Sequence, residues 1–148
     1  MNLLIIGGDE RSICLKNILE NNNFNTHSLF LNTDKNEIKN LNNFDTIFLP
    51  IPFERNSKLN APFYNEEINP SYILEKLKHF NGTIIGGFDK KSEDFFINEN
   101  LNFKNILKDE TFTLINAIIT AEGSIEKLIH ESEKSLFESD ACILGYGR

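Results

Sequence analysis

The sequence predicts an α/β fold built on an open, mainly parallel sheet with helices on both faces. Short continuous apolar runs, such as residues 3–6 and 45–49, are typical of strands buried on both faces of a parallel sheet. Segments with helical periodicity separate these runs, which indicates parallel strands joined by crossover helices. A chain of 148 residues, 40% of them hydrophobic, can bury such a core. We therefore expect a flavodoxin-like or Rossmann-like three-layer arrangement.

The first strand and helix follow from the N-terminal residues. Residues 2–7 form the first predicted strand, and Gly7 and Gly8 close it. Asp9 is a favourable N-cap for a helix over about residues 10–21, which an asparagine run then ends. Four apolar residues share one face of that helix and are expected to pack on the sheet: Cys14, Leu15, Ile18 and Leu19.

Three more strands and a helix are predicted in the middle of the chain. Residues 24–31 and 45–49 are strand-like, and residues 83–85 form another apolar run before a glycine pair. Residues 69–80 combine a cap, a proline at the first helical position and an apolar face. Residues 51–67 are rich in proline, asparagine and charge, so we interpret them as a long functional loop.

The segments that follow are less regular. Residues 88–108 are ambiguous, with a short helix expected at 94–97 and a short strand at 103–107. Asp109 opens the longest helical pattern in the chain. Gly123 interrupts this pattern, so the segment is either one long helix or two helices that meet there.

The last eight residues combine an apolar run with two glycines. Gly145, Gly147 and Arg148 follow the run, and a buried strand followed by Gly-x-Gly is how a dinucleotide-binding fingerprint opens. A glycine-rich tail after a last strand would look the same. We divide the chain into an N-terminal α/β domain over residues 1–140 and, over residues 141–148, the first strand and incomplete turn of a second domain.

Composition excludes several classes of partner. The net charge is −7, with 15 Lys and Arg against 22 Asp and Glu, which disfavours nucleic acid and anionic membrane surfaces.

No histidine pair has metal-ligand spacing, so no metal site is expected. Cys14 and Cys142 are predicted to be small buried hydrophobes in a reducing compartment. The N-terminal apolar run is too short for a signal peptide, and we expect a cytoplasmic protein.

Three predicted strands end in turns that contain a glycine pair or two prolines. The three turns are Gly7-Gly8, Pro50-Ile51-Pro52 and Gly86-Gly87. Parallel strands would bring these turns to one edge of the sheet, where ligands bind in open α/β folds. Asp9, Arg11, Glu54 and Arg55 follow closely behind them. Permissive backbone, a helix N-terminus and guanidinium groups suit a small carboxylate, although tight turns and solvated arginines would explain the same residues.

Several short blocks, in order along nearly the whole chain, share one family pattern. These blocks are residues 5–11, Leu49-Pro50, residues 60–63 with 66–68, Gly86-Gly87, residues 116–125 and residues 143–148. They resemble the family of N-terminal domains from the A subunit of dipicolinate synthase, which has Ile-Gly-Gly-Asp-x-Arg after its first strand and, later, Asn-x-x-x-Thr-x-Glu-Gly. Residues 53–58 do not match the family pattern.

The resemblance implies a function for the parent protein. Members of the family resemble NAD(P)-dependent oxidoreductases and act with the flavoprotein B subunit of dipicolinate synthase. They make dipicolinate from an intermediate of the dihydrodipicolinate pathway during sporulation, in the cytoplasm of the mother cell. The chain would then be the substrate-side domain for a small dicarboxylate. Most of the NAD(P) site would belong to a second domain, so no cofactor and no dehydrogenase activity are expected for these 148 residues by themselves.

The resemblance and the turn residues together give candidate site roles. Arg11 would pair with a substrate carboxylate, which the backbone amides of Gly7 and Gly8 would approach, and Asp9 would cap the helix or orient Arg11. The remaining candidates are Asn116 and Thr120 for substrate, Glu122 for proton transfer at an interdomain cleft, and Gly145, Gly147 and Arg148 for cofactor.

Two non-enzymatic alternatives compete with this interpretation. A receiver-like signalling domain would need a phosphorylatable Asp at the end of the third strand, where this chain has Pro50. A docking or small-carboxylate-binding module is the stronger alternative. Phe53, Phe63 and Tyr64 in the long loop could dock a partner protein, which such a module would bind without substrate or cofactor.

Overall fold

The computed structural model describes residues 1–32, 40–140 and 142–143. The chain forms two compact units, Met1–Ile106 and Leu107–Arg148, and each is described by itself. In the described part of the chain, no helix is both long enough and apolar enough to cross a membrane.

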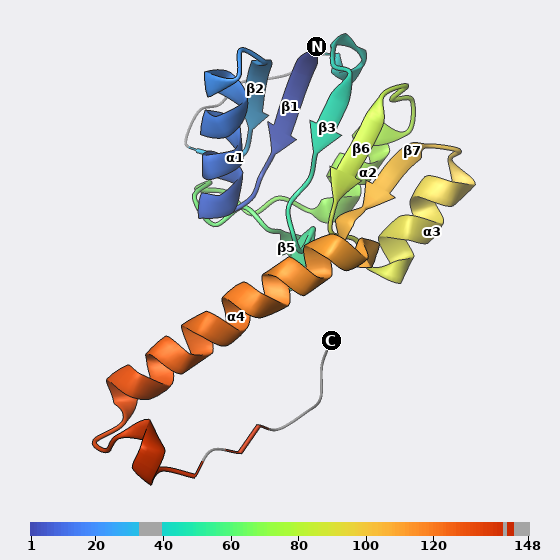
Figure 1. Ribbon diagram of the computed structural model, residues 1–148. Coiled ribbons are helices and arrows are strands. Elements are labelled where there is room, and N and C mark those ends of the chain that lie inside the picture. The colour runs from blue at the N-terminus through green and yellow to red at the C-terminus, as the bar shows by residue number, and fades with distance from the viewer. Residues whose placement is uncertain (33–39, 141, 144–148) are drawn as a thin grey trace. The chain divides into compact units, whose positions relative to one another are not determined.

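The first unit is built on a five-stranded parallel sheet, as predicted. Its strands are β1 (Asn2–Ile6), β2 (Asn25–Leu29), β3 (Thr46–Phe48), β6 (Thr83–Gly86) and β7 (Asn102–Asn105). The strand order is β2-β1-β3-β6-β7, and every neighbouring pair is parallel (Figure 1). The order reverses between β1 and β3, so the topological switch point lies where these two strands end.

Helices cover both faces of this sheet, which confirms the predicted fold class. The crossovers β1 to β2 and β3 to β6 run in opposite directions, so right-handed connections place their helices on opposite faces. The helices are α1 (Glu10–Asn21), α2 (Pro70–Leu77) and α3 (Lys90–Asn98). Figure 1 shows α1 in front of the sheet and α2 behind it.

The main hydrophobic core lies on the face covered by α2 and α3. Leu4, Ile47 and Ile84 pair across three neighbouring strands and are fully buried. Ile73 of α2 and Phe96 of α3 belong to the same cluster. Burying an aliphatic side chain of this size contributes about 1.5–3 kcal/mol, so the central strands are held chiefly by this layer.

The first helix packs less deeply than its sequence predicts. None of the residues of α1 is buried, Cys14 is exposed and Ile18 is 53% exposed. The expected burial of Cys14 is therefore wrong. Cys142, the other cysteine, is also exposed. Apolar spacing identifies the helix, but the depth of its contact depends on the sheet beneath it.

The long predicted loop contains a small hairpin. Strands β4 (Glu54–Arg55) and β5 (Lys58–Leu59) pair antiparallel through a turn at Asn56 and Ser57, which both have positive φ. Phe53, a docking residue in the alternative interpretation of this loop, is 2% exposed and packs edge-on against a second buried phenylalanine. The structure therefore excludes Phe53 from a docking surface, because the residue anchors the loop to the core.

Residues 88–108, which the sequence leaves ambiguous, form a helix, a strand and a short 3-10 helix. Helix α3 starts four residues before the predicted short helix, because Asp89 caps it by accepting from the Ser92 amide. Strand β7 ends at Asn105, whose buried side chain bonds both main-chain groups of Phe88 and the Glu93 carboxylate. These bonds fix the loop between β6 and α3. A buried amide network of this kind leaves no periodicity in the sequence.

The second unit contains α4 (Glu110–Glu131), a single continuous helix. This settles the question raised by Gly123, which lies inside the helix with no atom within 4 Å of an added Cβ. The helical spacing predicts continuation as far as Phe137, but α4 ends at Glu131. Short 3-10 helices complete the elements at Leu41–Asn43, Ile106–Lys108 and Leu136–Glu138.

The predicted strand at residues 141–144 falls partly outside the described residues. The described residues of that run, Cys142 and Ile143, are exposed and lie in no strand. Their predicted burial is therefore wrong for this chain. Gly145, Gly147 and Arg148, the cofactor-binding candidates, lie outside the described residues.

Candidate functional site

The turn after β1 depends on two glycines. Gly7 and Gly8 have φ values of +60° and +106°, a region that L side chains rarely adopt. The Gly7 amide donates to the Leu29 carbonyl at 2.8 Å, and the Gly8 amide donates to the Asn60 carbonyl at 2.6 Å. Both N–H groups therefore have acceptors within the chain. In the structure these glycines form the turn, and their amides are already bonded within the chain, so they do not supply the donors expected for a ligand carboxylate.

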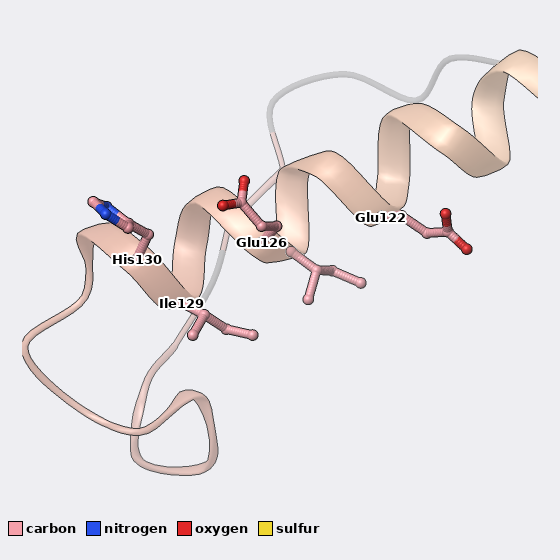
Figure 2. A pocket seen from close by; sticks show the side chains of 5 residues that line it. Glu122, Glu126, Ile129 and His130 are labelled. Carbon is pink, nitrogen blue, oxygen red and sulfur yellow. The ribbon is translucent and has the colours of Figure 1, made fainter.

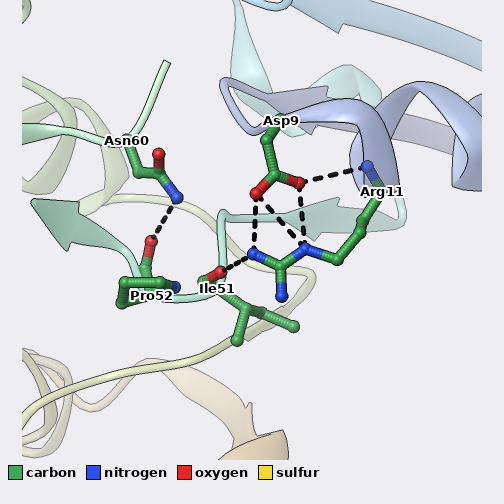
Figure 3. A network of polar contacts seen from close by, with 5 residues as sticks. All are labelled: Asp9, Arg11, Ile51, Pro52 and Asn60. Carbon is green, nitrogen blue, oxygen red and sulfur yellow. Dashed lines mark hydrogen bonds and ion pairs between the residues drawn. The ribbon is translucent and has the colours of Figure 1, made fainter. Parts of the chain in front are cut away.

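Asp9 and Arg11 form an ion pair at the start of α1. The Asp9 carboxylate caps the helix by accepting from the Arg11 amide at 3.1 Å. It also accepts from Arg11 Nε at 3.0 Å and from Nη2 at 2.7 Å (Figure 3). Asp9 thus performs both roles predicted for it, capping the helix and orienting Arg11.

A third acceptor brings Arg11 to the end of β3. Its Nη2 donates to the Ile51 carbonyl at 2.6 Å, so the guanidinium bridges the two turns at the switch point (Figure 3). The side chain is 64% exposed, and its Nη1 has no acceptor among the described residues. The Glu10 amide also has no acceptor within the described part of the chain, whereas the Asp9 amide bonds its own carboxylate. One guanidinium nitrogen and one helix N-terminal amide therefore remain for an anionic ligand.

Asn60 is a site residue that the sequence by itself does not single out. It is 3% exposed and lies after β5, where its carbonyl accepts from the Gly8 amide and its Nδ2 donates to the Pro52 carbonyl at 3.2 Å. It belongs to one of the blocks that carry the family resemblance. One buried asparagine in an asparagine-rich loop gives no distinguishing signal in a single sequence.

The ion pair shifts both ionisation equilibria. Hydrogen bonding from the guanidinium holds the pKa of Asp9 below its ordinary value of 3.8, against the opposing effect of partial burial. The same hydrogen bonds raise the pKa of Arg11. Both groups are charged at neutral pH. Asp9 neutralises much of the charge of Arg11, so the site favours one carboxylate over a polyanion.

These shifts predict how Asp9→Asn changes the pH dependence of stability. A lowered carboxyl pKa stabilises the fold above the unfolded pKa, and that contribution disappears as pH falls through the folded pKa. Asparagine is an equally good N-cap, so the substitution removes mainly the ion pair. At pH 7 we expect a loss below about 1 kcal/mol, because both side chains reach solvent. Urea unfolding from pH 2 to 7 should show the difference in stability between the two proteins shrinking as pH falls below 3.8, the ordinary pKa of the carboxyl group. A constant difference across that range would contradict this origin.

The candidates on α4 do not share one face. Thr120 and Asn116 are one turn apart, and the Thr120 hydroxyl donates to the Asn116 carbonyl at 2.7 Å. Glu122 lies about 160° around the helix axis from Thr120. All three are exposed. Glu122 instead lines a shallow hollow on the helix with Ile125, Glu126, Ile129 and His130 (Figure 2). The helix therefore separates the proposed acid–base group from the proposed polar contacts.

The described residues contain no group of three or more His, Cys, Asp or Glu side chains that could hold a metal ion. Of the other charged residues expected near the turns, Glu54 and Arg55 lie on β4 and are both exposed. The Asp9–Arg11 pair with Ile51 is thus the polar network that the fold builds at the switch point.

Comparisons with known proteins agree with this architecture. A family model described as the N-terminal domain of the dipicolinate synthase A subunit matches residues 2–107. The chain is similar to the A chain of dipicolinate synthase from Bacillus subtilis, with 17% identity and a TM-score of 0.71 over 91% of this chain and 49% of that chain. It is also similar to the dipicolinate synthase A subunit from Bacillus halodurans, with 20% identity and a TM-score of 0.74 over 90% of this chain and 50% of that chain.

The chain spans about half the length of these two solved structures. No curated protein matches it significantly. The similarity to the solved structures shows a shared fold, and the family model confirms the resemblance found in the sequence. The chain belongs to the family of N-terminal domains of the dipicolinate synthase A subunit.

Proposed function

We propose that this chain is the substrate-side part of a dipicolinate synthase and that it binds a carboxylate of a small ring dicarboxylic acid at the switch point. The observation that carries the proposal is the position of Arg11. Its guanidinium is held by Asp9 after β1 and by the Ile51 carbonyl after β3, at the edge where open α/β sheets bind ligands.

The arrangement suits one carboxylate. Arg11 Nη1 supplies a charged donor, and the Glu10 amide supplies a neutral donor at the positive end of α1. Because Asp9 already fixes the guanidinium, little side-chain freedom would be lost on binding. Pre-organised donors of this kind discriminate a carboxylate from a neutral group of the same size.

The first unit does not fit the pyrophosphate of a dinucleotide. In a dinucleotide-binding turn the pyrophosphate lies at the helix N-terminus, where this chain places the Asp9 carboxylate. We therefore assign no step of the reaction to NAD(P) in this unit. In our proposal the cofactor belongs to a second domain that begins with residues 141–148, where Gly145, Gly147 and Arg148 would contact it, in an oxidoreductase that makes dipicolinate during sporulation.

Other parts of the proposal rest on the family alone. The parent protein would act in the cytoplasm of the mother cell with the flavoprotein B subunit. Dehydrogenation of a ring dicarboxylic acid would transfer a hydride to the nicotinamide held by the second domain and release a proton. Glu122, in the block that matches the family's Asn-x-x-x-Thr-x-Glu-Gly, is the proposed proton acceptor. Replacing Glu122 with Gln in the complete enzyme should lower kcat if this role is right.

Arg11→Ala tests the binding site directly. We propose titrating dipicolinate into the isotope-labelled chain and following amide chemical shifts near the switch point. Losing a charge-assisted hydrogen bond is worth about 1.5–3 kcal/mol, so Arg11→Ala should weaken binding about tenfold or more. Lys76→Ala is the matched control, because it also removes one positive charge but lies in the last turn of α2. Unchanged affinity in Arg11→Ala, or an equal loss in Lys76→Ala, would refute a specific site.

A further inference from the structure

We infer that Asn60 is a positioning residue that holds the Arg11 guanidinium in place for a ligand carboxylate. It acts on Arg11 indirectly, since the two residues are joined through the turns after β1 and β3. The ligand-binding part of this inference rests on the proposed function, whereas the positioning part does not.

Asn60 connects the two turns through both its main chain and its side chain. Its carbonyl accepts from the Gly8 amide at 2.6 Å, and its own amide donates to the Phe53 carbonyl at 3.1 Å. Its Nδ2 donates to the Pro52 carbonyl at 3.2 Å (Figure 3). With only 3% of the residue exposed, water cannot readily replace these bonds.

Two of these bonds lie one residue from an acceptor of Arg11. Gly8 precedes Asp9, whose carboxylate accepts hydrogen bonds from Arg11 Nε and Nη2. Pro52 follows Ile51, whose carbonyl receives Nη2 at 2.6 Å. Asn60 therefore fixes the spacing between the carboxylate and the carbonyl that together set the direction of the guanidinium. Without that spacing, the Arg11 guanidinium can hydrogen-bond the Asp9 carboxylate or the Ile51 carbonyl in good geometry, but not both.

The bond to the Pro52 carbonyl requires a side chain that carries a donor as far from the main chain as the amide of asparagine. An alanine leaves the Pro52 carbonyl without its donor in a buried place, and the segment can then shift. A serine keeps a hydroxyl but is too short to span the distance that Nδ2 covers. Both substitutions preserve the two main-chain bonds of residue 60, so they test the side chain itself.

The experiment measures the pKa of Asp9 by carbon NMR and the affinity for dipicolinate by titration. The variants are Asn60→Ala, Asn60→Ser and, as the reference for complete loss of the guanidinium, Arg11→Ala. Asn105→Ala is the matched control, because it also removes a buried amide that donates to a main-chain carbonyl, at Phe88. The serine variant keeps a polar group, so it supplies both measurements even if the alanine variant fails to fold.

We expect both Asn60 variants to raise the pKa of Asp9 toward its value in Arg11→Ala and to weaken dipicolinate binding about fivefold. Asn105→Ala should lower the unfolding midpoint while leaving both quantities unchanged. An unchanged Asp9 pKa in Asn60→Ser, or an equal rise in Asn105→Ala, would overturn the positioning role. If Arg11→Ala binds dipicolinate as well as the unmodified chain does, the proposed function fails, while the Asp9 pKa still decides the role of Asn60.

Discussion

Replacing Gly8 with Ala is expected to destabilise the first unit by about 2–4 kcal/mol. Gly8 has φ +106°, where an L side chain is strained, and an added Cβ would lie 2.5 Å from Ser12 Cβ and closer still to Ser12 Oγ. The clash is with the first turn of α1, so relief would move the helix away from the turn. Because the Gly8 amide donates to the Asn60 carbonyl, that movement would also loosen the switch point.

Gly123→Ala is the matched control for this prediction. It makes the same substitution at a helical glycine where nothing lies within 4 Å of the added Cβ. Alanine is favoured over glycine inside a helix by about 1 kcal/mol, so this variant should be slightly more stable than the original chain. Hydrogen exchange resolves α4 from the sheet and measures both changes. Equal effects of the two substitutions would refute the geometric origin of the Gly8 penalty.

Phe53→Ala is the second substitution with a large expected effect. Phe53 is 2% exposed, and its ring packs edge-on against Phe88 with centroids 6.2 Å apart. Truncating a buried phenylalanine costs about 3–5 kcal/mol, from lost burial and the cavity left behind. The main-chain bonds of Phe53 to Gly87 and Asn60 remain in this variant, but the segment after β3 loses the ring that anchors it near the point where Ile51 meets Arg11.

Urea unfolding of Phe53→Ala and of two controls tests this expectation. Phe53→Leu keeps most of the buried volume and should cost less than about 1.5 kcal/mol. Phe137→Ala removes a phenylalanine that is 97% exposed and should change stability by less than about 0.5 kcal/mol. A small effect of Phe53→Ala would mean that the loop after β3 is not anchored by this ring. It would also reopen the alternative in which the loop docks a partner.

Much of the fold could be predicted because its signals are local. The apolar runs that became β1 and β3 are buried on both faces, and β6 is buried on one face and half-buried on the other. Such strands lose the polar alternation that would otherwise mark an exposed side. Asp9 and Asn69 cap α1 and α2 as their positions predict. The parallel order then brings the three glycine and proline turns to one edge of the sheet.

Burial within each element was harder to predict. Cys14 and Ile18 have helical spacing but are exposed on α1, and Phe53 lies in a polar loop but is buried. Sequence spacing indicates which face of a helix is apolar. How deeply the residues on that face are buried depends on which other element packs against it. The hairpin of β4 and β5 brings Asn60 back to the Gly8 turn, and no pattern near either residue indicates that contact.

By itself, the sequence determined the fold class, the family resemblance, the position of the strand-end turns and the local pair of Asp9 and Arg11. The tertiary structure decided that Arg11 also reaches Ile51 and that the Gly7 and Gly8 amides already have acceptors. Capping and buried strands depend on neighbours within a few residues, so local sequence specifies them. The contacts of Arg11 and Gly8 join residues about 40 and 50 positions apart, and only the folded sheet brings those residues together.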